Sequence, residues 1–255
     1  MTSIQIQNNE LLIIIHNNIN NKIPSSFIRK GDGENIIIGY RIIPDIKLRK
    51  YLKMLRRMNI RYSHISFQKY IRKELISAFN NCDYLGIAPE DHRHGSWRYE
   101  EKILKKFNFS TAQYCDMNFH FKFIKIPGED KLKSDIAEKI ISNKNIGVIS
   151  CFNVEQFLQK YNSNVSCFYD LVKQRNRNPL YKITSETYQN IFELIKENHN
   201  VDFWIVAAGI HAKIFCNYIK INNGIAIDIG SSIDTWNDVY NNRGHLRKIY
   251  ADYTN

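Results

Sequence analysis

Residues 201–230 read VDFWIVAAGIHAKIFCNYIKINNGIAIDIG, and this stretch decides the fold class. Three elements are expected within it: a strand over residues 201–207, a helix over residues 211–221 and a buried strand over residues 225–229. Gly224 follows the helix and suits the left-handed position that ends many helices. A strand, a helix and a strand in this order predict two parallel strands joined by a right-handed crossover.

The same alternation continues toward the N-terminus. Further strands are expected over residues 10–16, 26–29, 84–88 and 146–150. Helices are expected over residues 45–58, capped by Asp45, over 185–198, capped by Ser185, and over 67–79, 97–107, 134–142 and 154–161. Alternating strands and helices predict an α/β fold, with a mostly parallel twisted sheet flanked by helices. The length of 255 residues suits a single domain over residues 1–255.

The composition agrees with a folded protein that works in the cytoplasm. Hydrophobic residues make up 44% of the chain and charged residues 24%, so a large core is available. No apolar run reaches the roughly 18 residues of a membrane span, and no basic segment precedes a leader-like apolar stretch. The five cysteines form no CxxC pair, which favours reduced thiols over a zinc site or a disulfide framework.

The net charge of +11 is concentrated in one part of the chain. Residues 41–75 contain eleven Lys or Arg and two acidic residues, a local excess of nine positive charges. This basic helical segment, at about residues 45–80, has three interpretations: a solvated helix face, a nucleic-acid surface, or a helix that lies on anionic lipid. Its apolar positions resemble ordinary core packing, which leaves the basic side for an anionic partner.

Gly31-Asp32-Gly33-Glu34 is the first candidate site, and it is expected to form a turn after the strand at residues 26–29. Asp32 and Glu34 repel each other unless a cation lies between them, and carboxylates suit Mg²⁺ or Mn²⁺. Such ions bridge diphosphate oxygens, and Arg29 and Lys30, just before the turn, are placed to neutralise the same phosphates. The alternative is a solvated Asp-Gly hairpin turn, which is common.

Two further candidate sites follow strand ends in the last third of the chain. Gly209, His211 and Lys213 lie where a strand ends and a helix begins, a place where open α/β sheets bind anionic ligands. The second is Asp228-Ile229-Gly230-Ser231-Ser232, which resembles a methyltransferase nucleotide motif. Only 25 residues follow Gly230, so this segment is expected to end the sheet, and Ser231, Ser232 and Asp234 are candidates for contacts with a ribose or sugar.

The polar loop after the strand at residues 84–88 contains Glu90, Asp91, His92 and His94. Glu90 or Asp91 is a candidate general base for an acceptor hydroxyl. The two histidines are spaced as a metal pair, although an exposed loop is the more common meaning of such a sequence.

Two separated segments together resemble the GT-D-fold glycosyltransferases. Residues 27–34, FIRKGDGE, are similar to the R-x-GDGE signature of that family. Residues 206–213, VAAGIHAK, and 224–230, GIAIDIG, are similar to its C-terminal Gly-x-x-Ala-Lys and Asp-x-Gly block. The order and the intervals also fit, over about residues 27–236. The pattern departs after the last glycine, where many members continue Gly-His-Ile-Asp and this chain has Gly230-Ser231-Ser232-Ile233-Asp234.

The resemblance implies a Rossmann-like GT-D fold and a metal-dependent glycosyltransferase. Asp32 and Glu34 are then the metal ligands and catalytic carboxylates, with Mn²⁺ or Mg²⁺ as cofactor. The implied nucleotide-sugar-binding residues are Arg29, Gly31, Gly33, Gly209, His211, Lys213, Asp228, Ser231, Ser232 and Asp234.

The implied reaction transfers a hexose from a nucleotide-diphosphate sugar, with a UDP-sugar favoured, to a glycan or lipid-linked saccharide in surface polysaccharide or glycoprotein synthesis. A peripheral position at the inner face of the membrane is a further expectation. Two alternatives remain: a nucleic-acid-binding protein that uses the basic residues 41–73, which is disfavoured, and an S-adenosylmethionine-dependent methyltransferase.

Overall fold

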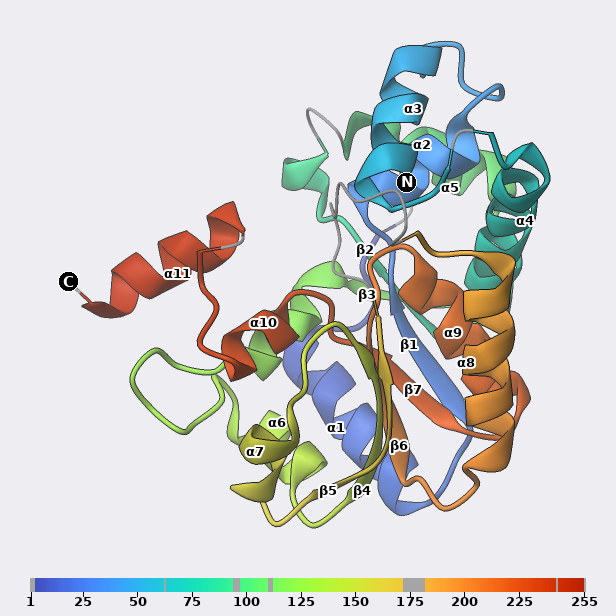
Figure 1. The fold of residues 1–255 in the computed structure, drawn as a ribbon. Helices are drawn as coiled ribbons and strands as arrows, with labels where there is room; N and C mark the ends of the chain where they lie inside the picture. The colour runs from blue at the N-terminus through green and yellow to red at the C-terminus, as the bar shows by residue number, and fades with distance from the viewer. Residues whose placement is uncertain are drawn as a thin grey trace.

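The computed structural model describes residues 3–61, 63–93, 97–109, 112–171, 182–241 and 243–254 (Figure 1). Within these residues, parallel strands form one seven-stranded sheet in the order β3-β2-β1-β7-β6-β4-β5. The strands are β1 (Ser25–Arg29), β2 (Tyr84–Ile87), β3 (Gln113–Asp116), β4 (Asn145–Ser150), β5 (Asn164–Asp170), β6 (Phe203–Ala207) and β7 (Ile225–Asp228). The expected α/β class with a parallel sheet is confirmed.

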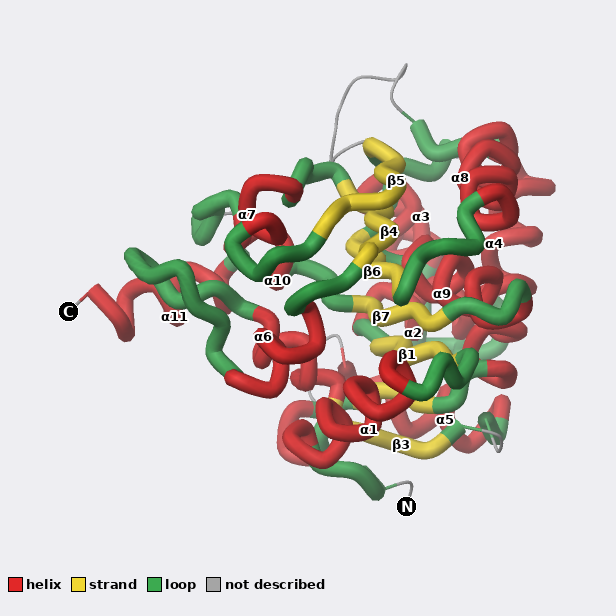
Figure 2. The backbone as a smooth tube through the Cα atoms, turned by 90° about the horizontal axis from the view of Figure 1, so that it is seen from below, coloured by secondary structure: helices red, strands yellow, loops and turns green. Residues whose placement is uncertain are grey.

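Helices cover both faces of the sheet, which Figure 2 shows edge-on. One face carries α2 (Asp32–Gly39), α3 (Leu48–Arg57), α4 (Ile65–Asn81), α5 (Glu100–Phe107), α8 (Ser185–Glu197) and α9 (His211–Ile221). The other carries α1 (Asn8–Asn20), α6 (Asp135–Ile141), α7 (Glu155–Gln159), α10 (Ser232–Trp236) and the 3-10 helix η3 (Met117–Phe123). The short 3-10 helices η1 (Glu90–His92) and η2 (Trp97–Tyr99) precede α5, and α11 (Gly244–Thr254) ends the described chain.

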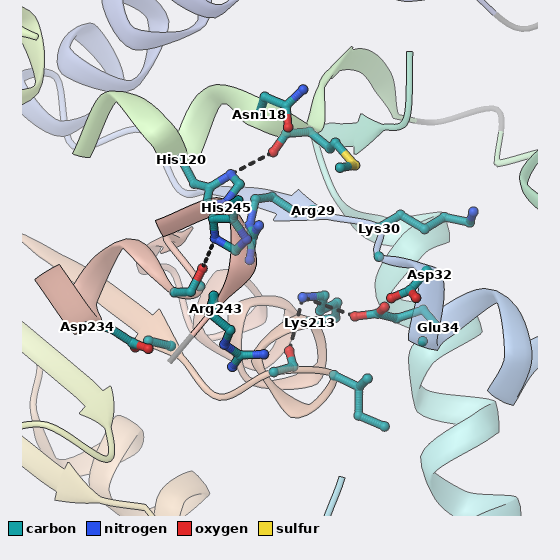
Figure 3. Close-up of a pocket in the computed structure, with 18 of the residues that line it drawn as sticks. Arg29, Lys30, Asp32, Glu34, Asn118, His120, Lys213, Asp234, Arg243 and His245 are labelled. Carbon is teal, nitrogen blue, oxygen red and sulfur yellow. Dashed lines mark hydrogen bonds and ion pairs between the residues drawn. The ribbon is translucent and has the colours of Figure 1, made fainter. Parts of the chain in front are cut away.

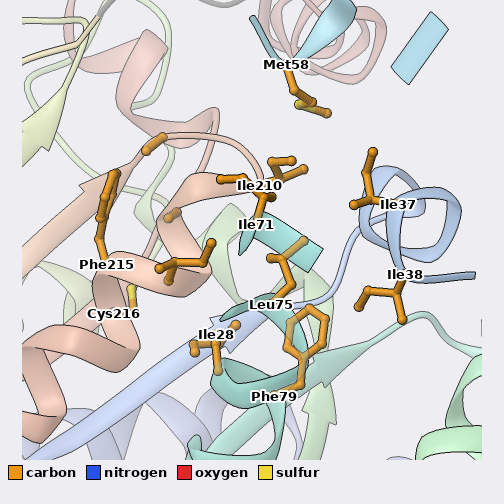
Figure 4. Packing of buried hydrophobic residues seen from close by; sticks show 14 of the residues in the cluster. Ile28, Ile37, Ile38, Met58, Ile71, Leu75, Phe79, Ile210, Phe215 and Cys216 are labelled. Carbon is orange, nitrogen blue, oxygen red and sulfur yellow. The ribbon is translucent and has the colours of Figure 1, made fainter. Parts of the chain in front are cut away.

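The central strands are apolar because both of their faces are covered. Phe27 and Ile28 are adjacent in β1, are both fully buried, and point into the two different cores. Figure 4 shows side chains from β1, α2, α4 and α9 gathered in one of these cores, including Ile28, Ile38 and Leu75. This packing fixes α2 and α9, the two helices that begin closest to the candidate residues.

The sheet has a topological switch point between β1 and β7. After β1 the chain enters α2 on one face, whereas after β7 it enters α10 on the other face. The two connections diverge at the carboxyl ends of neighbouring strands and leave a crevice there. Open α/β sheets bind their ligands in such a crevice.

The predicted strand-helix-strand unit is confirmed by β6, α9 and β7. Ile205 of β6 lies beside Ile227 of β7 in parallel register. The left-handed residue after α9 is Asn223, with a φ of 62°, and not Gly224 as expected. Gly224 is needed for a different reason: a Cβ there would lie 2.6 Å from the side chain of Ile219.

Three local predictions were wrong. Residues 10–16 lie within helix α1 and not in a strand, because Leu11, Leu12, Ile15 and Ile19 form one buried helical face. Residues 31–34 start α2 and do not form a hairpin turn. Asp45 does not cap α3, which begins after Lys47; the Asp45 carboxylate instead pairs with Lys102 at 2.7 Å.

In the part of the chain that the structure describes, no helix combines the length and the apolar composition needed to cross a bilayer. The expected basic helical segment at about residues 45–80 corresponds to α3 and α4.

Candidate functional site

A cavity of about 620 Å³ lies at the switch point, at the carboxyl ends of β1, β6 and β7 (Figure 3). Its wall includes the first residues of α2, the loop before α9 and the loop after β7. The volume is within the usual range for a pocket that binds a small molecule. The crevice predicted by the topology is therefore a real cavity of ligand size.

Lys213 of α9 is the centre of the site. Its Nζ lies 2.6 Å from Oδ2 of Asp228 and 3.1 Å from Oε1 of Glu34, and it donates to the carbonyl of Gly209 at 3.0 Å. Burial alone would lower the pKa of Lys213, but Asp228 and Glu34 outweigh it and raise that pKa. The ammonium is therefore charged and joins α2, α9 and β7 in one ion-pair network.

Arg29 completes this network from β1. Its Nη2 lies 3.3 Å from Oδ1 of Asp228, and its Nε donates to the Asp228 carbonyl at 3.1 Å. Burial would raise the pKa of Asp228, but Arg29 and Lys213 outweigh it and lower that pKa. Asp228 is an ionised, fully buried carboxylate that holds two cations at the edge of the cavity.

Gly230 leaves the space that Arg29 occupies. A Cβ at this position would lie 1.8 Å from the Arg29 guanidinium, and the φ of Gly230 is +49°. The Gly230 amide also donates to Oδ1 of Asp228 at 3.1 Å. The glycine of the Asp-x-Gly segment is thus required both by the backbone and by the neighbouring arginine.

The Gly31-Asp32-Gly33-Glu34 segment places a helix N-terminus at the cavity. Gly31 is the N-cap of α2, and a Cβ there would lie 2.5 Å from Oε2 of Glu34. Gly33 is equally close-packed, since its Cβ would meet Met58 and Met54 of α3 at 3.0 and 3.1 Å. The glycines serve close packing, and the amides of the first turn of a helix, which no preceding turn can bond, favour a bound anion.

The donor groups present suit a divalent cation that arrives with a phosphate ligand. Among the described residues, no three His, Cys, Asp or Glu side chains gather as a metal cage. Asp32 lines the cavity, whereas the Glu34 carboxylate is already paired with Lys213. Mg²⁺ and Mn²⁺ bind through one or two carboxylates when substrate phosphates supply further oxygens. The site therefore fits an ion shared between Asp32 and a diphosphate.

Most of the predicted binding residues are brought together at this cavity. Those that line it are Arg29, Gly31, Asp32, Gly33, Glu34, Gly209, Lys213, Ser231 and Asp234. Asp228 is close to them but acts through Arg29 and Lys213. Glu90 and Asp91 are exposed on η1 and are not part of the lining, although His92 is. His94 lies outside the described residues.

His211 and Ser232 are placed differently from the prediction. Both ring nitrogens of His211 are bonded inside the core, Nδ1 to the Tyr188 hydroxyl at 2.7 Å and Nε2 to the Met58 carbonyl at 3.0 Å. Ser232 is fully buried and donates to the carbonyl of His120 at 2.6 Å. Neither side chain lines the cavity, because each faces the packed interior at the start of its helix.

Several residues that line the cavity were not predicted from the sequence. His120 is one: its Nδ1 donates to the Met117 carbonyl at 2.9 Å, which leaves Nε2 as the acceptor, and burial lowers the pKa of the ring well below its usual value. The others include Arg57, Trp97, Asn118, Phe121, Phe152, Arg243 and His245. His120 belongs to the sequence MNFHFKF, which carries no motif, and Arg57 was counted only as part of the basic run.

The fold has counterparts among known proteins. A family model described as a GT-D fold-like domain matches residues 6–236. The comparison with curated proteins finds no match.

Among solved structures, the chain is similar to the domain of unknown function 1792, described as having a distinct glycosyltransferase fold. The TM-score is 0.54 and the identity 16%, with 91% of this chain and 79% of the other covered. It is also similar to a new glycosyltransferase (DUF1792) from Streptococcus sanguinis, with a TM-score of 0.54, 12% identity, and 93% and 84% of the two chains covered. At these identities the structural likeness shows the fold alone. The family model, however, spans most of the chain, and the protein therefore belongs to the GT-D fold-like family and has a glycosyltransferase fold.

Proposed function

We propose that this glycosyltransferase moves a hexose from a nucleotide-diphosphate sugar, with UDP-sugars as the first candidates, to a glycan or lipid-linked saccharide. In this proposal the whole chain, residues 1–255, forms one catalytic domain. The observation that carries the proposal is the cavity at the switch point, which is bordered by the N-termini of α2 and α9 and lined by Asp32, Arg29 and Lys213. Helix N-termini and cations are the groups that bind a diphosphate, and a nearby carboxylate allows a bridging metal ion.

On the donor side, the proposal gives each residue of the network a separate task. Asp32 would hold Mn²⁺ or Mg²⁺ together with the phosphate oxygens, and the bound ion supplies Lewis-acid stabilisation of the leaving diphosphate. Glu34 and Asp228 hold Lys213 in place. Lys213, Arg29 and the α2 N-terminus then present positive potential where negative charge develops as the sugar leaves.

On the acceptor side, His120 lines the cavity and Glu90 and Asp91 do not, so His120 is the base for the acceptor hydroxyl. The His120 ring is neutral, its tautomer is set by the Met117 carbonyl, and it lines the cavity. As the acceptor oxygen bonds to the anomeric carbon, the bond from that carbon to the diphosphate oxygen breaks and the diphosphate takes the electron pair. The hydroxyl proton passes to Nε2 of His120; because burial lowers the pKa of this ring, the transfer comes late, when bonding to the anomeric carbon has made the hydroxyl strongly acidic.

The basic charge of α3 supports a lipid-linked acceptor and a place for the protein at the membrane surface. Arg49, Lys53 and Arg56 are exposed on this helix, as is Lys47 just before it, and Leu48 is 53% exposed among them. A basic face with an exposed apolar residue suits the surface of an anionic membrane, where lipid-linked saccharides are found. We therefore propose a peripheral position at the inner face of the membrane and a role in polysaccharide or glycoprotein synthesis.

A thermal-shift screen tests the donor assignment. Nucleoside diphosphates and nucleotide-sugars are added with Mn²⁺ or with a chelator, and the melting temperature is measured. We expect at least one of these ligands to stabilise the protein only with Mn²⁺, and Asp32→Asn to abolish that stabilisation. Glu90→Gln, which changes an exposed carboxylate outside the cavity, is the matched control and retains it.

Absence of any shift with all these compounds would reject the proposed function. Stabilisation by S-adenosylmethionine without metal would support a methyltransferase instead. Strong, salt-sensitive binding of oligonucleotides that ignores Asp32→Asn would support a nucleic-acid-binding protein.

A further inference from the structure

The cations at the cavity differ in whether their charge is already paired. Arg29 and Lys213 are held by the two buried carboxylates, Asp228 and Glu34, so this group of four is neutral as a whole. Lys30, next in sequence to Arg29, is turned away and is fully buried against Glu100, 2.6 Å from its carboxylate. These three cations are already paired with carboxylates, so the negative charge of a diphosphate in the cavity calls for a further cation.

Arg57 is different from these three cations. It is the last residue of α3 and lines the cavity. Its Nε is buried and has no hydrogen-bond partner, and the described residues include no ion-pair partner for its guanidinium. A buried N–H group without an acceptor is unfavourable unless a ligand supplies one. The fork geometry of the guanidinium matches two oxygens of a phosphate.

The end of α3 is fixed against both helix N-termini at the cavity. The side chain of Met58 lies where a Cβ on Gly33 would touch it at 3.0 Å, so the end of α3 packs on the first turn of α2. The carbonyl of Met58 accepts a hydrogen bond from Nε2 of His211, the first residue of α9. These contacts fix Met58, and Arg57 immediately before it lines the same cavity as residues 31–34.

His211 has a defined tautomer in this arrangement. The Met58 carbonyl can only accept, so Nε2 carries the proton and Nδ1 accepts from the Tyr188 hydroxyl at 2.7 Å. His211 and Tyr188 are 1% and 2% exposed. A buried hydrogen-bonded chain thus runs from α8 through α9 to the residue that follows Arg57.

We infer that Arg57 binds the diphosphate of the donor, and that His211 is a positioning residue that holds the end of α3 for this purpose. The inference rests on the proposed function, since it names a donor ligand within the same cavity. It also assigns a specific task to one arginine of the basic run, distinct from the exposed cations of α3.

The test is a calorimetric titration with UDP and with inorganic pyrophosphate, both in the presence of Mn²⁺. Arg57→Ala is compared with Arg56→Ala, which removes the same charge from the exposed neighbour on the same helix. We expect Arg57→Ala to weaken binding of both probes at least tenfold and Arg56→Ala to change it less than threefold. Arg57→Lys keeps the charge but loses the fork, so it should give an intermediate affinity, and it replaces the alanine variant if that variant unfolds.

His211→Gln separates positioning from direct contact. We expect it to weaken the binding of UDP, because the end of α3 is displaced. The double variant His211→Gln with Arg57→Ala should bind UDP no more weakly than Arg57→Ala alone. Wild-type binding that Arg57→Ala and Arg56→Ala reduce equally would overturn the inference and leave the proposed function standing. Wild-type protein that binds neither UDP nor pyrophosphate would overturn both.

Discussion

At the scale of single residues, Asp228 explains why the Asp-x-Gly segment is built as it is. Its carboxylate accepts from Lys213, Arg29 and the Gly230 amide while fully buried. A buried carboxylate is stable only when such partners replace its water. Asp228 therefore holds Arg29 and Lys213 in place and does not line the cavity itself. The Asp-x-Gly motif alone did not show whether this carboxylate holds other residues or contacts the ligand directly.

The buried His211 makes stability depend on pH. Burial lowers the pKa of His211 to about 4, whereas an exposed histidine titrates near 6.5. As pH falls from 6.5 toward 4, the unfolded chain takes up a proton that the folded protein does not, so stability is lost in this window. At about 1.4 kcal/mol per pKa unit, the loss from this group is about 3 kcal/mol.

Urea unfolding of the wild type and of His211→Gln at pH 7.5 and pH 4.5 measures this contribution. We expect the wild type to lose about 2.5 kcal/mol more than the variant between the two conditions, since pH 4.5 lies short of the end of this window. Equal losses in the two proteins would show that His211 is not the neutral, buried group described above.

The sequence was informative for some site residues and silent for others. Asp32, Arg29 and Lys213 stand in recognisable motifs, and the structure brings them to one cavity. Arg57 stands in a run of basic residues, and the sequence does not show which of them faces the cavity. That depends on how α3 packs on Gly33. His120 belongs to no motif. Its place at the cavity depends on η3, and the strand before η3 was not predicted from the sequence.

At the scale of elements, strong periodicity was predicted well and short apolar runs were not. Helix α9 was predicted with its observed bounds, and α4 within two residues at each end. The apolar run at residues 10–16 predicted a strand and lies in α1, because a few consecutive apolar residues fit either structure. Strands β3 and β5 were missed, since edge strands are less completely buried and lack a continuous apolar pattern.

Helix α3 carries the prediction about membranes. If its exposed face binds anionic lipid, Lys53→Glu with Arg56→Glu should reduce binding to vesicles that contain phosphatidylserine. At about 1 kcal/mol for each cation near the surface, the double variant loses at least about 2 kcal/mol of binding free energy. Vesicle sedimentation measures the bound fraction, with phosphatidylcholine vesicles as the lipid control.

The matched protein control is Lys139→Glu with Lys196→Glu, which reverses two exposed cations on α6 and α8. It should bind anionic vesicles more strongly than the α3 variant. If both double variants lose binding equally, the interaction follows net charge and α3 is not a specific membrane surface. If the wild type does not bind these vesicles, the proposed peripheral location is wrong.

At the scale of the whole molecule, the strand order is what turns separate motifs into a site. β1 and β7 are neighbours although about 200 residues separate them in the chain. The sequence predicted parallel strands but not this order, because pairing between distant strands leaves no local pattern. The family resemblance supplied the expectation that the two motifs meet, and the β1–β7 register shows how they do.

The central claim is that this cavity binds a nucleotide-sugar through its diphosphate. The most direct test is a crystal structure of the protein with Mn²⁺ and the nucleotide-sugar that stabilises it best. The account predicts the diphosphate at the N-terminus of α2, with a metal ion on Asp32 and the phosphate oxygens within hydrogen-bond distance of Arg57. A nucleotide-sugar bound elsewhere on the molecule, with this cavity filled only by water, would contradict it.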